Sequence, residues 1–153
     1  MPLDVLTDTV IARPVEVVAS YAGDPTHAPE WYANIRSVEW RTAPPIAVGS
    51  QIDFVAQFLG RRLAYTYEIS ELTPGERLVM RTAQGPFPME TTYTWEPFDE
   101  GTRMTLRNRG EPSGFACVAA PVMDRTIRRA TSKDLARLKS ILESAEGPVT
   151  EGL

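Results

Sequence analysis

The sequence is poor in the residues that most often carry catalysis or bind metals. Its 153 residues include one cysteine, Cys117, and one histidine, His27. A single cysteine cannot close an internal disulfide bond, and this pair cannot supply a thiolate-rich or histidine-rich metal site. The chain also has no glycine-rich phosphate loop and no Ser-His-Asp order. We therefore expect no metal and no cofactor, and we expect Cys117 to be a small buried hydrophobic residue.

The sequence also has no excess of positive charge and no long apolar run. The formal net charge is −4, which argues against nucleic-acid binding because such binding needs a basic surface. No apolar run is long enough to cross a bilayer, and the N-terminus, with Asp4 and Asp8, lacks the apolar core of a secretory signal. These features predict a cytoplasmic protein without membrane insertion or a nucleic-acid partner, present as a monomer or homodimer.

What the sequence does contain fits one folded domain. Its length suits a single domain, and its hydrophobic share of 42% is close to the average for globular proteins. We predict one α+β domain over residues 1–146, followed by a flexible C-terminal tail over residues 147–153.

The first part of the chain predicts one strand followed by two short helices. Residues 5–12 form the strand, and Gly23 ends a helix over residues 15–21. Asp24 can cap a second short helix that runs to near Asn34.

In the middle of the chain, apolar residues recur at every second position. This alternation is typical of strands with one buried face, and turn residues separate the segments. We therefore expect an antiparallel meander. The predicted strands span residues 37–41, 52–59, 63–70, 78–82, 89–96 and 103–109.

After residue 113 the apolar period returns to about 3.6 residues, which predicts a long C-terminal helix with a broad apolar stripe. This helix would span residues 114–144, and Pro121 either kinks it or marks a true start near Ala120. The charged residues of the segment, Asp134 among them, are expected on the opposite, polar face.

Several short motifs occur in a particular order between Thr9 and Glu143. They are Ile11-Ala12-Arg13-Pro14 with Glu16-Val17-Val18; Asp24-Pro25 before Pro29-Glu30-Trp31; Val48-Gly49; Glu71-Leu72-Thr73-Pro74 before Arg77-Leu78; Gly101-Thr102-Arg103; and Leu135-Ala136-Arg137-Leu138-Lys139. Together they resemble the Bet v 1-like superfamily, also called START or SRPBCC, and within it the bacterial polyketide cyclase/dehydrase branch. The resemblance implies a helix-grip fold, in which a curved antiparallel sheet of about seven strands wraps around a long C-terminal helix. It also implies a cavity for a lipid, polyketide or similar molecule.

A sheet wrapped around a helix can enclose more volume than its side chains fill, and concave apolar spaces are the usual small-molecule sites. Strand alternation and helix periodicity indicate which side chains face this space, and we expect Trp31 at its mouth. The predicted ligand-binding residues are Trp31, Phe54, Phe58, Tyr65, Tyr67, Met80, Thr82, Thr91, Tyr93, Met104, Leu106, Asn108, Phe115, Ala119, Val122 and Met123.

The polar members of this set limit what can be bound. A hydroxyl buried without a partner costs ~1–3 kcal/mol, so Tyr65, Tyr67 and Tyr93 must bond to one another, to water or to a ligand. Asn108 is the one amide on its strand face. It either positions a ligand carbonyl or closes a turn, and we favour the turn.

Candidate catalytic residues are few. Tyr65, Tyr67 or Tyr93 could donate to a substrate carbonyl, with His27 as a proton shuttle, although a lone surface histidine is the more common arrangement. Glu90 is expected on the outer face of the sheet unless a bulge turns it inward, where it would become an acid/base candidate. The expected ion pairs on the outer face join Arg103, Arg107 and Arg109 to Glu90, Glu96 or Glu68.

Three functions are compatible with these features. The leading hypothesis is a protein that binds a small hydrophobic or aromatic molecule. The second is an enzyme of the polyketide cyclase, aromatase or dehydrase kind, which folds a flexible substrate and polarises a carbonyl. The third, which the resemblance implies, is a protein-interaction module that assists chaperones. The first two predict an internal cavity, and the third predicts a filled core with an exposed apolar patch.

Overall fold

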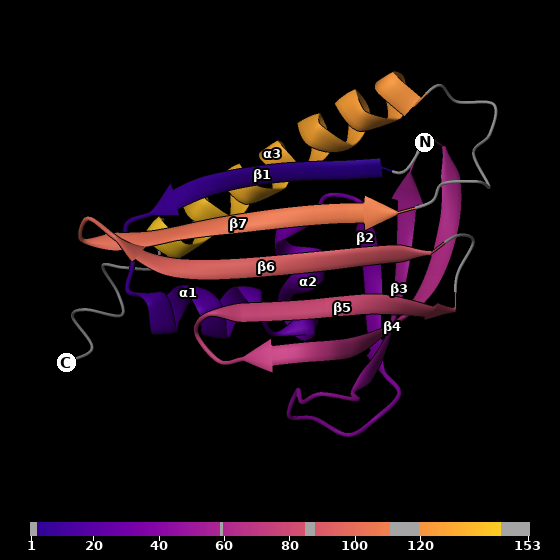
Figure 1. Cartoon of the computed structure of the whole chain (residues 1–153), viewed down its shortest axis with the longest axis horizontal. Coiled ribbons are helices and arrows are strands. Elements are labelled where there is room, and N and C mark those ends of the chain that lie inside the picture. Colours follow the sequence, from indigo (N-terminus) through magenta and orange to yellow (C-terminus); the bar gives the residue numbers. More distant parts are fainter. Residues whose placement is uncertain (1–2, 59, 85–87, 111–119, 145–153) are drawn as a thin grey trace.

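The fold is an antiparallel sheet with helices on one side of it. The computed structural model describes residues 3–58, 60–84, 88–110 and 120–144. Figure 1 shows α1, α2 and α3 behind the sheet. The elements are β1 (Leu3–Ile11), α1 (Val15–Ala22), the 3₁₀ helix η1 (Pro25–His27), α2 (Ala28–Trp31), β2 (Ile35–Trp40), β3 (Gln51–Phe58), β4 (Arg61–Thr73), β5 (Arg77–Gln84), β6 (Met89–Phe98), β7 (Gly101–Gly110) and α3 (Ala120–Ser144).

The strands form one sheet in the order β1-β7-β6-β5-β4-β3-β2, and all neighbours are antiparallel. Strands β2 to β7 follow one another as the predicted meander, and β1 pairs with β7. The predicted element order is therefore confirmed, with ends that shift by a few residues. The second short helical segment ends at Trp31 and not near Asn34, and the described part of the long helix begins at Ala120.

Irregular pairing contributes to the curvature of this sheet. The register shifts between Ile35 and Ser37 on β2, and again at two points along β4, which spans 13 residues. Bulges of this kind bend a strand and increase its twist. In Figure 1, β2 and β3 run steeply across the direction of β1, β6 and β7. The sheet therefore curls around the space that faces the helices.

Alternate side chains of the strands point into the concave face, as the sequence predicts. On β7, Thr102, Met104 and Leu106 are buried, whereas Arg103 and Arg107 are exposed. The same alternation of buried and exposed positions runs along most of β1. Hydrophobic burial thus fixes which face of each strand meets the helices.

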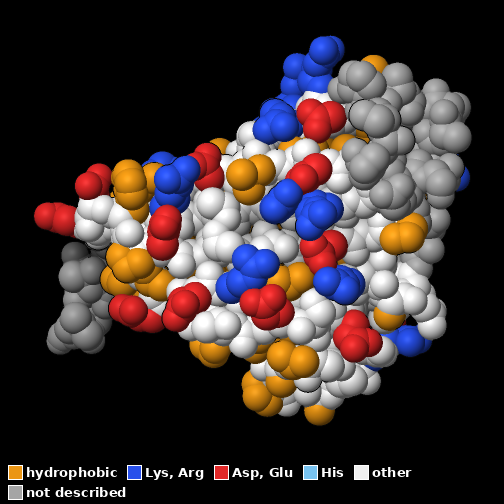
Figure 2. All heavy atoms as spheres, in the orientation of Figure 1, with side chains coloured by type: hydrophobic (Ala, Val, Ile, Leu, Met, Phe, Trp, Pro, Cys, Tyr) orange, Lys and Arg blue, Asp and Glu red, His pale blue; other side chains and the backbone are white. Residues whose placement is uncertain are grey.

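The convex face carries charges of both signs, interspersed as Figure 2 shows. The prediction of glutamate partners is correct for Arg109 and wrong for Arg103 and Arg107. These two arginines contact aspartates on β1, because β1 pairs directly with β7 in the sheet although it lies far away in the sequence. The pairs are Arg103–Asp8 (2.8 Å), Arg107–Asp4 (2.6 Å), Arg109–Glu90 (3.7 Å) and Arg81–Glu90 (2.7 Å).

Helix α3 runs beside β1, which is an edge strand of the sheet. Lys139 Nζ donates a hydrogen bond of 2.7 Å to the carbonyl of Val10, and Arg128 Nη1 donates one of 3.0 Å to the carbonyl of Leu6. An uncovered edge strand presents unpaired backbone groups to other chains. These side chains occupy some of those groups and hold the helix against the sheet.

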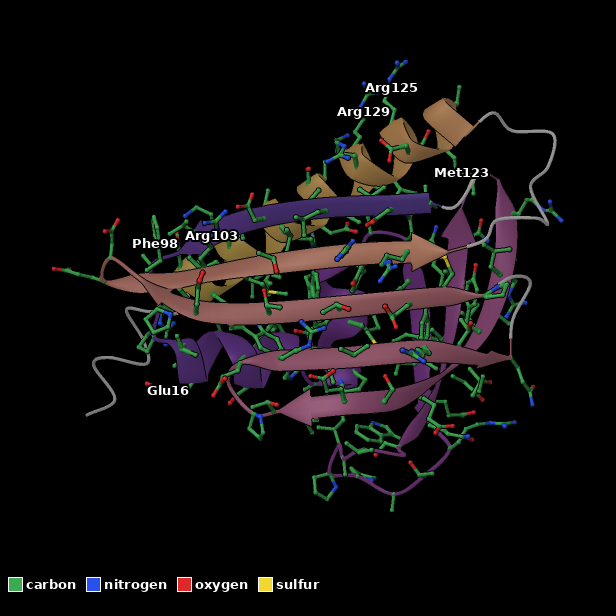
Figure 3. The ribbon with its side chains drawn as sticks, viewed as in Figure 1. Glu16, Phe98, Arg103, Met123, Arg125 and Arg129 are labelled. Atoms are coloured by element: carbon green, nitrogen blue, oxygen red, sulfur yellow. The ribbon has the colours of Figure 1, made fainter. Side chains whose placement is uncertain are left out.

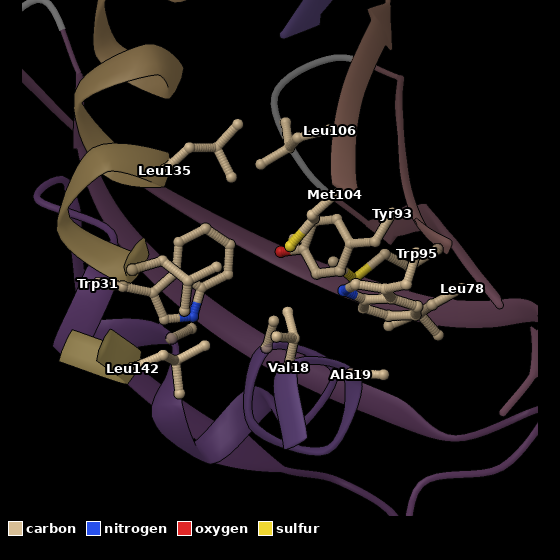
Figure 4. Close-up of a cluster of buried hydrophobic side chains, with 14 of the residues drawn as sticks. Val18, Ala19, Trp31, Leu78, Tyr93, Trp95, Met104, Leu106, Leu135 and Leu142 are labelled. Carbon is tan, nitrogen blue, oxygen red and sulfur yellow. The ribbon is translucent and has the colours of Figure 1, made fainter. Parts of the chain in front are cut away.

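The main core lies between the sheet, α1 and the C-terminal half of α3. Figure 4 shows Trp31, Trp95, Leu106 and Leu135 within this cluster of buried side chains. The indole N–H groups of both tryptophans are buried and have no hydrogen-bond partner among the described residues. The core side chains pack beside the C-terminal half of α3, and the cavity described below lies on the same side of the sheet, nearer the other end of the helix.

Candidate functional site

A cavity of about 160 Å³ lies between the concave face of the sheet and α3. For comparison, an apolar cavity of roughly 150 Å³ is large enough to bind benzene. This space can therefore hold at least one ring of an organic molecule. Its described walls are Tyr32, Asn34, Ile35, Phe54, Ala56, Leu63, Tyr65, Tyr67, Met80, Met89, Thr91, Tyr93, Asn108, Ile127, Ala130, Thr131 and Asp134.

Aromatic rings make up much of the wall. The ring of Phe54 meets Tyr67 edge-on, with centroids 5.4 Å apart, and the Tyr65 and Tyr67 centroids are 5.8 Å apart. Burial raises the pKa of Tyr67 to about 12, while a hydrogen bond with Thr91 opposes the rise. Burial raises the pKa of Tyr65 as well. These hydroxyls therefore stay protonated at neutral pH.

Two further tyrosines form a buried hydroxyl pair. The oxygens of Tyr32, which follows α2, and Tyr93 on β6 are 2.6 Å apart. Burial is the main cause that raises the pKa of each phenol. Because one hydroxyl donates to the other, one of the two protons remains available to a third group. The pair can thus donate one hydrogen bond toward the cavity.

Asp134 is the charged residue among the described walls. Its side chain comes from α3, and the residue is 3% exposed. Its Oδ1 accepts a hydrogen bond of 3.0 Å from the backbone N–H of Ala33. Burial raises the pKa of Asp134 to about 6, although the Ala33 hydrogen bond and the charge of Arg137 both oppose the rise. The cavity therefore contains a carboxyl group that changes charge not far below neutral pH.

Asn108 also faces the cavity, where Thr91 Oγ1 donates a hydrogen bond of 2.8 Å to its Oδ1. The sequence left two roles open for this amide, and its place in the wall differs from the turn position that we favoured. The amide nitrogen of Asn108 can donate to a ligand, because the Thr91 bond uses only the oxygen.

The structure brings seven of the predicted binding residues together in the cavity wall. Other predicted residues lie elsewhere: Trp31, Met104 and Leu106 are buried in the main core, Met123 in a second apolar cluster, and Thr82 bonds to the backbone of Met89. The side chain of Phe58, and Phe115, Cys117, Ala119 and residues 147–153, lie outside the described residues. The seven wall residues are Phe54, Tyr65, Tyr67, Met80, Thr91, Tyr93 and Asn108.

Two of the displaced residues show why their positions differ from the prediction. Trp31 was expected at the cavity mouth, but its ring packs against Tyr32 at 4.1 Å and Tyr93 at 5.8 Å, so it supports the wall from behind. Val122 was expected to face the sheet, but it is 51% exposed. It lies on the outer side of α3, from which Arg125 also points away from the protein in Figure 3.

Sequence reasoning missed Tyr32 and Asp134. Asp134 was assigned to the polar face of the long helix because it is charged, and this assignment is wrong because the residue is buried. The spacing of Ile127, Thr131, Asp134 and Leu138 was a signal that could have found it, since such positions share one helix face. Tyr32 lies in a short connection without any periodicity, so no sequence pattern indicated its direction.

The remaining candidates lie away from the cavity wall. His27 stacks on Tyr21, with centroids 4.2 Å apart, and its Nδ1 is 2.9 Å from the Tyr21 carbonyl oxygen. Glu90 is on the outer face, where Arg81 Nε donates to it at 2.7 Å, so no bulge has turned it inward. Neither residue is among the described residues that line the cavity.

Two other kinds of site were sought in the described part of the chain. Within residues 3–58, 60–84, 88–110 and 120–144, no group of three or more potential ligands could hold a metal ion. None of the helices in these ranges combines the length and the hydrophobicity needed to span a bilayer.

Comparisons with known proteins place this geometry in context. Solved structures of similar fold include TTHA0849 from Thermus thermophilus, with a TM-score of 0.79 and 21% identity over 93% of this chain and 98% of that one. The Zhui aromatase/cyclase from a Streptomyces species has a TM-score of 0.75 and 15% sequence identity, over 95% of this chain and 96% of that one. A START superfamily protein from Mycobacterium smegmatis has a TM-score of 0.69 and 17% sequence identity, over 95% of this chain and 98% of that one. At these identities the likeness shows the fold alone, and it confirms the predicted helix-grip fold.

Sequence comparison assigns the family. No curated protein sequence matches the chain. The family model described as polyketide cyclase/dehydrase and lipid transport matches residues 3–143. This match covers the whole sheet and nearly all of α3, and it agrees with the resemblance seen in the sequence motifs. The chain therefore belongs to the polyketide cyclase/dehydrase and lipid transport family.

Proposed function

We propose that the protein binds one small, largely apolar organic molecule in the cavity between the sheet and α3. The observation that carries this proposal is the cavity itself, a ring-sized space with aromatic walls. Its polar groups are few, namely the Tyr32–Tyr93 pair, Asp134 and the Thr91–Asn108 pair. Apolar walls with a small number of placed polar groups are typical of small-molecule sites. A protein-interaction module with a filled core would not need such a space.

A neutral fragment tests the proposal directly. We would titrate the protein with benzyl alcohol and follow the backbone amide signals by NMR. The largest shifts should fall on residues of the cavity wall, including the α3 residues Ala130 and Thr131. The proposal would be contradicted if the signals of the cavity wall did not shift, whether or not signals shifted elsewhere.

Two variants on α3 provide a matched comparison. Ala130 lines the cavity, whereas Ala136 is exposed on the same helix. Ala130→Phe places a ring in the cavity and should abolish benzyl alcohol binding, and Ala136→Phe should leave binding unchanged. Thermal unfolding of both variants shows whether each is folded. If Ala130→Phe does not fold, Ala56→Leu serves as a second variant that fills the cavity from β3. Equal binding by a folded cavity-filled variant and the wild type would contradict the proposal.

One observation favours catalysis as a second candidate function. Asp134, with its pKa near 6, shares the cavity with the hydroxyls of Tyr32 and Tyr93. A general acid or base works best when its pKa is close to the operating pH, and a phenol can polarise a carbonyl. An enzyme of the cyclase/dehydrase kind should lose about 100-fold or more of its turnover in Asp134→Asn while substrate binding survives. A protein that only binds its ligand would show no turnover to lose.

A further inference from the structure

The charge distribution of the cavity is one-sided. Among its described wall residues, Asp134 is acidic and none is basic. Within the described part of the chain, no lysine or arginine nitrogen lies within 4 Å of the Asp134 carboxylate. A second negative charge in this space would be repelled at low dielectric, and a positive charge would be attracted. The cavity therefore discriminates against carboxylate-bearing ligands.

The carboxylate is only partly used by the fold. Oδ1 accepts the Ala33 N–H, and no other described group donates a hydrogen bond to Asp134. A carboxylate has acceptor capacity for several donors. Since folding has already removed Asp134 from bulk water, a ligand that donates to it does not have to desolvate the carboxylate again. A donor group on the ligand therefore gains more here than it would at an exposed aspartate.

The aromatic walls favour a cationic donor over a neutral one. The rings of Tyr32, Tyr67 and Tyr93 line the same cavity as Asp134. The negative faces of aromatic rings attract ammonium groups by ~0.5–2 kcal/mol, depending on how far the cation is desolvated. An ammonium group can thus meet both the carboxylate and the rings, while the apolar part of its molecule fills the remaining volume.

From this combination we infer that the cavity selects an organic amine, in which a protonated nitrogen on an apolar ring-bearing body is received by Asp134. The inference rests on the proposed function and names the ligand class of the same site. The Tyr32–Tyr93 pair and Asn108 can each donate one hydrogen bond, so a second, hydrogen-bond-accepting group on the same ligand is accommodated.

Three fragments of one shape separate charge from size. Benzylamine is a cation near neutral pH, benzyl alcohol is neutral and benzoate is an anion. At about pH 7.5 we expect the wild type to bind benzylamine about tenfold more tightly than benzyl alcohol, with benzoate weakest. Amide NMR titration measures each affinity and confirms that the shifts fall on the cavity wall.

Two charge-removing variants show whether Asp134 is the cause. Asp134→Asn keeps an oxygen for the Ala33 N–H, so we expect the preference for benzylamine over benzyl alcohol to fall to within about twofold. Asp124→Asn removes a carboxylate from the same helix at a site facing Arg128, and its amine preference should equal that of the wild type.

The pH dependence of the wild type gives a test that needs no variant. Protonation of Asp134 between about pH 7.5 and about pH 5 should reduce the amine preference, because alkylamines stay charged over this range. Among the neighbouring groups, Glu30 bonds the Tyr21 hydroxyl and His27 stacks on Tyr21, away from the wall. The four tyrosines of the wall, Tyr32, Tyr65, Tyr67 and Tyr93, have a raised pKa and stay protonated in this range, and Arg137 is the cation that acts on Asp134.

The outcomes distinguish a failure of the amine inference from a failure of the proposed binding function. Benzyl alcohol or benzoate bound in the cavity as tightly as benzylamine would overturn the amine inference and leave the proposed binding function standing. An amine preference that persists in Asp134→Asn would overturn it as well. If none of the three fragments shifts the cavity signals, both the inference and the proposed function fail.

Discussion

The buried carboxylate of Asp134 should make the protein less stable at neutral pH than an uncharged residue would. In the unfolded chain this carboxyl ionises near its ordinary pKa of 3.8, and in the folded protein burial raises the pKa to about 6. The folded state therefore holds the proton to higher pH. Stability is greatest while both states are protonated and falls as pH rises from about 4 through about 6.

The size of the effect follows from the pKa difference. Each pKa unit corresponds to 1.36 kcal/mol, so a difference of about two units gives about 3 kcal/mol. Asp134→Asn removes the charge and retains an acceptor for the Ala33 N–H. The free energy of unfolding of the variant, relative to the wild type, should thus rise by about 2 kcal/mol between about pH 4 and about pH 7.5, because the unfolded carboxyl is already about half ionised at pH 4. Any effect of the Asp134→Asn substitution on stability that does not depend on pH cancels when the differences at the two pH values are compared.

Urea denaturation at a series of pH values measures this difference. Asp124→Asn is the control, because Asp124 pairs with Arg128 at the surface of the same helix. Its relative stability should vary by less than about 0.5 kcal/mol over the range. A difference for Asp134→Asn that stays flat across the same range would show that the carboxylate is not desolvated, and would refute the reasoning on which the cavity electrostatics rest.

Three further predictions concern packing and hydrogen bonds. Tyr93→Phe should lower the free energy of unfolding by ~1–3 kcal/mol by leaving the Tyr32 hydroxyl without its partner, and the double Phe variant should recover part of that loss in a denaturation cycle. Gly101→Ala should destabilise by ~1–3 kcal/mol, because its Cβ would lie 2.3 Å from the Ile11 carbonyl oxygen, and an unchanged melting temperature would contradict this. Arg13→Ala should cost ~1–3 kcal/mol and increase amide hydrogen exchange in the last turn of α3, whose carbonyl the buried guanidinium bonds at 2.8 Å; unaltered exchange would argue against that anchoring.

The sequence could predict the direction in which side chains point. Alternation along the strands placed Phe54, Tyr65, Tyr67 and Tyr93 on the concave face, where the structure has them. This succeeds because a strand's period of two is a local property, so it needs no knowledge of the partner strands. The motif order likewise indicated the family, because turns and caps are also local.

Alternation could not predict which inward-facing residues line the cavity, or which residues form ion pairs across the sheet. Met104 and Leu106 point inward as expected, yet α3 and the core fill the space in front of them, so they line no cavity. Arg103 and Arg107 pair with β1, whose neighbour in the sheet lies about a hundred residues away in the sequence. What stands opposite a residue depends on contacts that local periodicity does not encode.

The sequence by itself thus determined the element order, the inward faces of the strands and the apolar stripe of the long helix, because these follow from backbone periods and hydrophobic burial. Only the tertiary structure decided where an unfilled space remains between those faces. It also decided that Asp134 lies within that space and that Tyr32 meets Tyr93, 61 residues away. The reason is physical: desolvation and pairing depend on every group that surrounds an atom, and in this fold those groups come from distant parts of the chain.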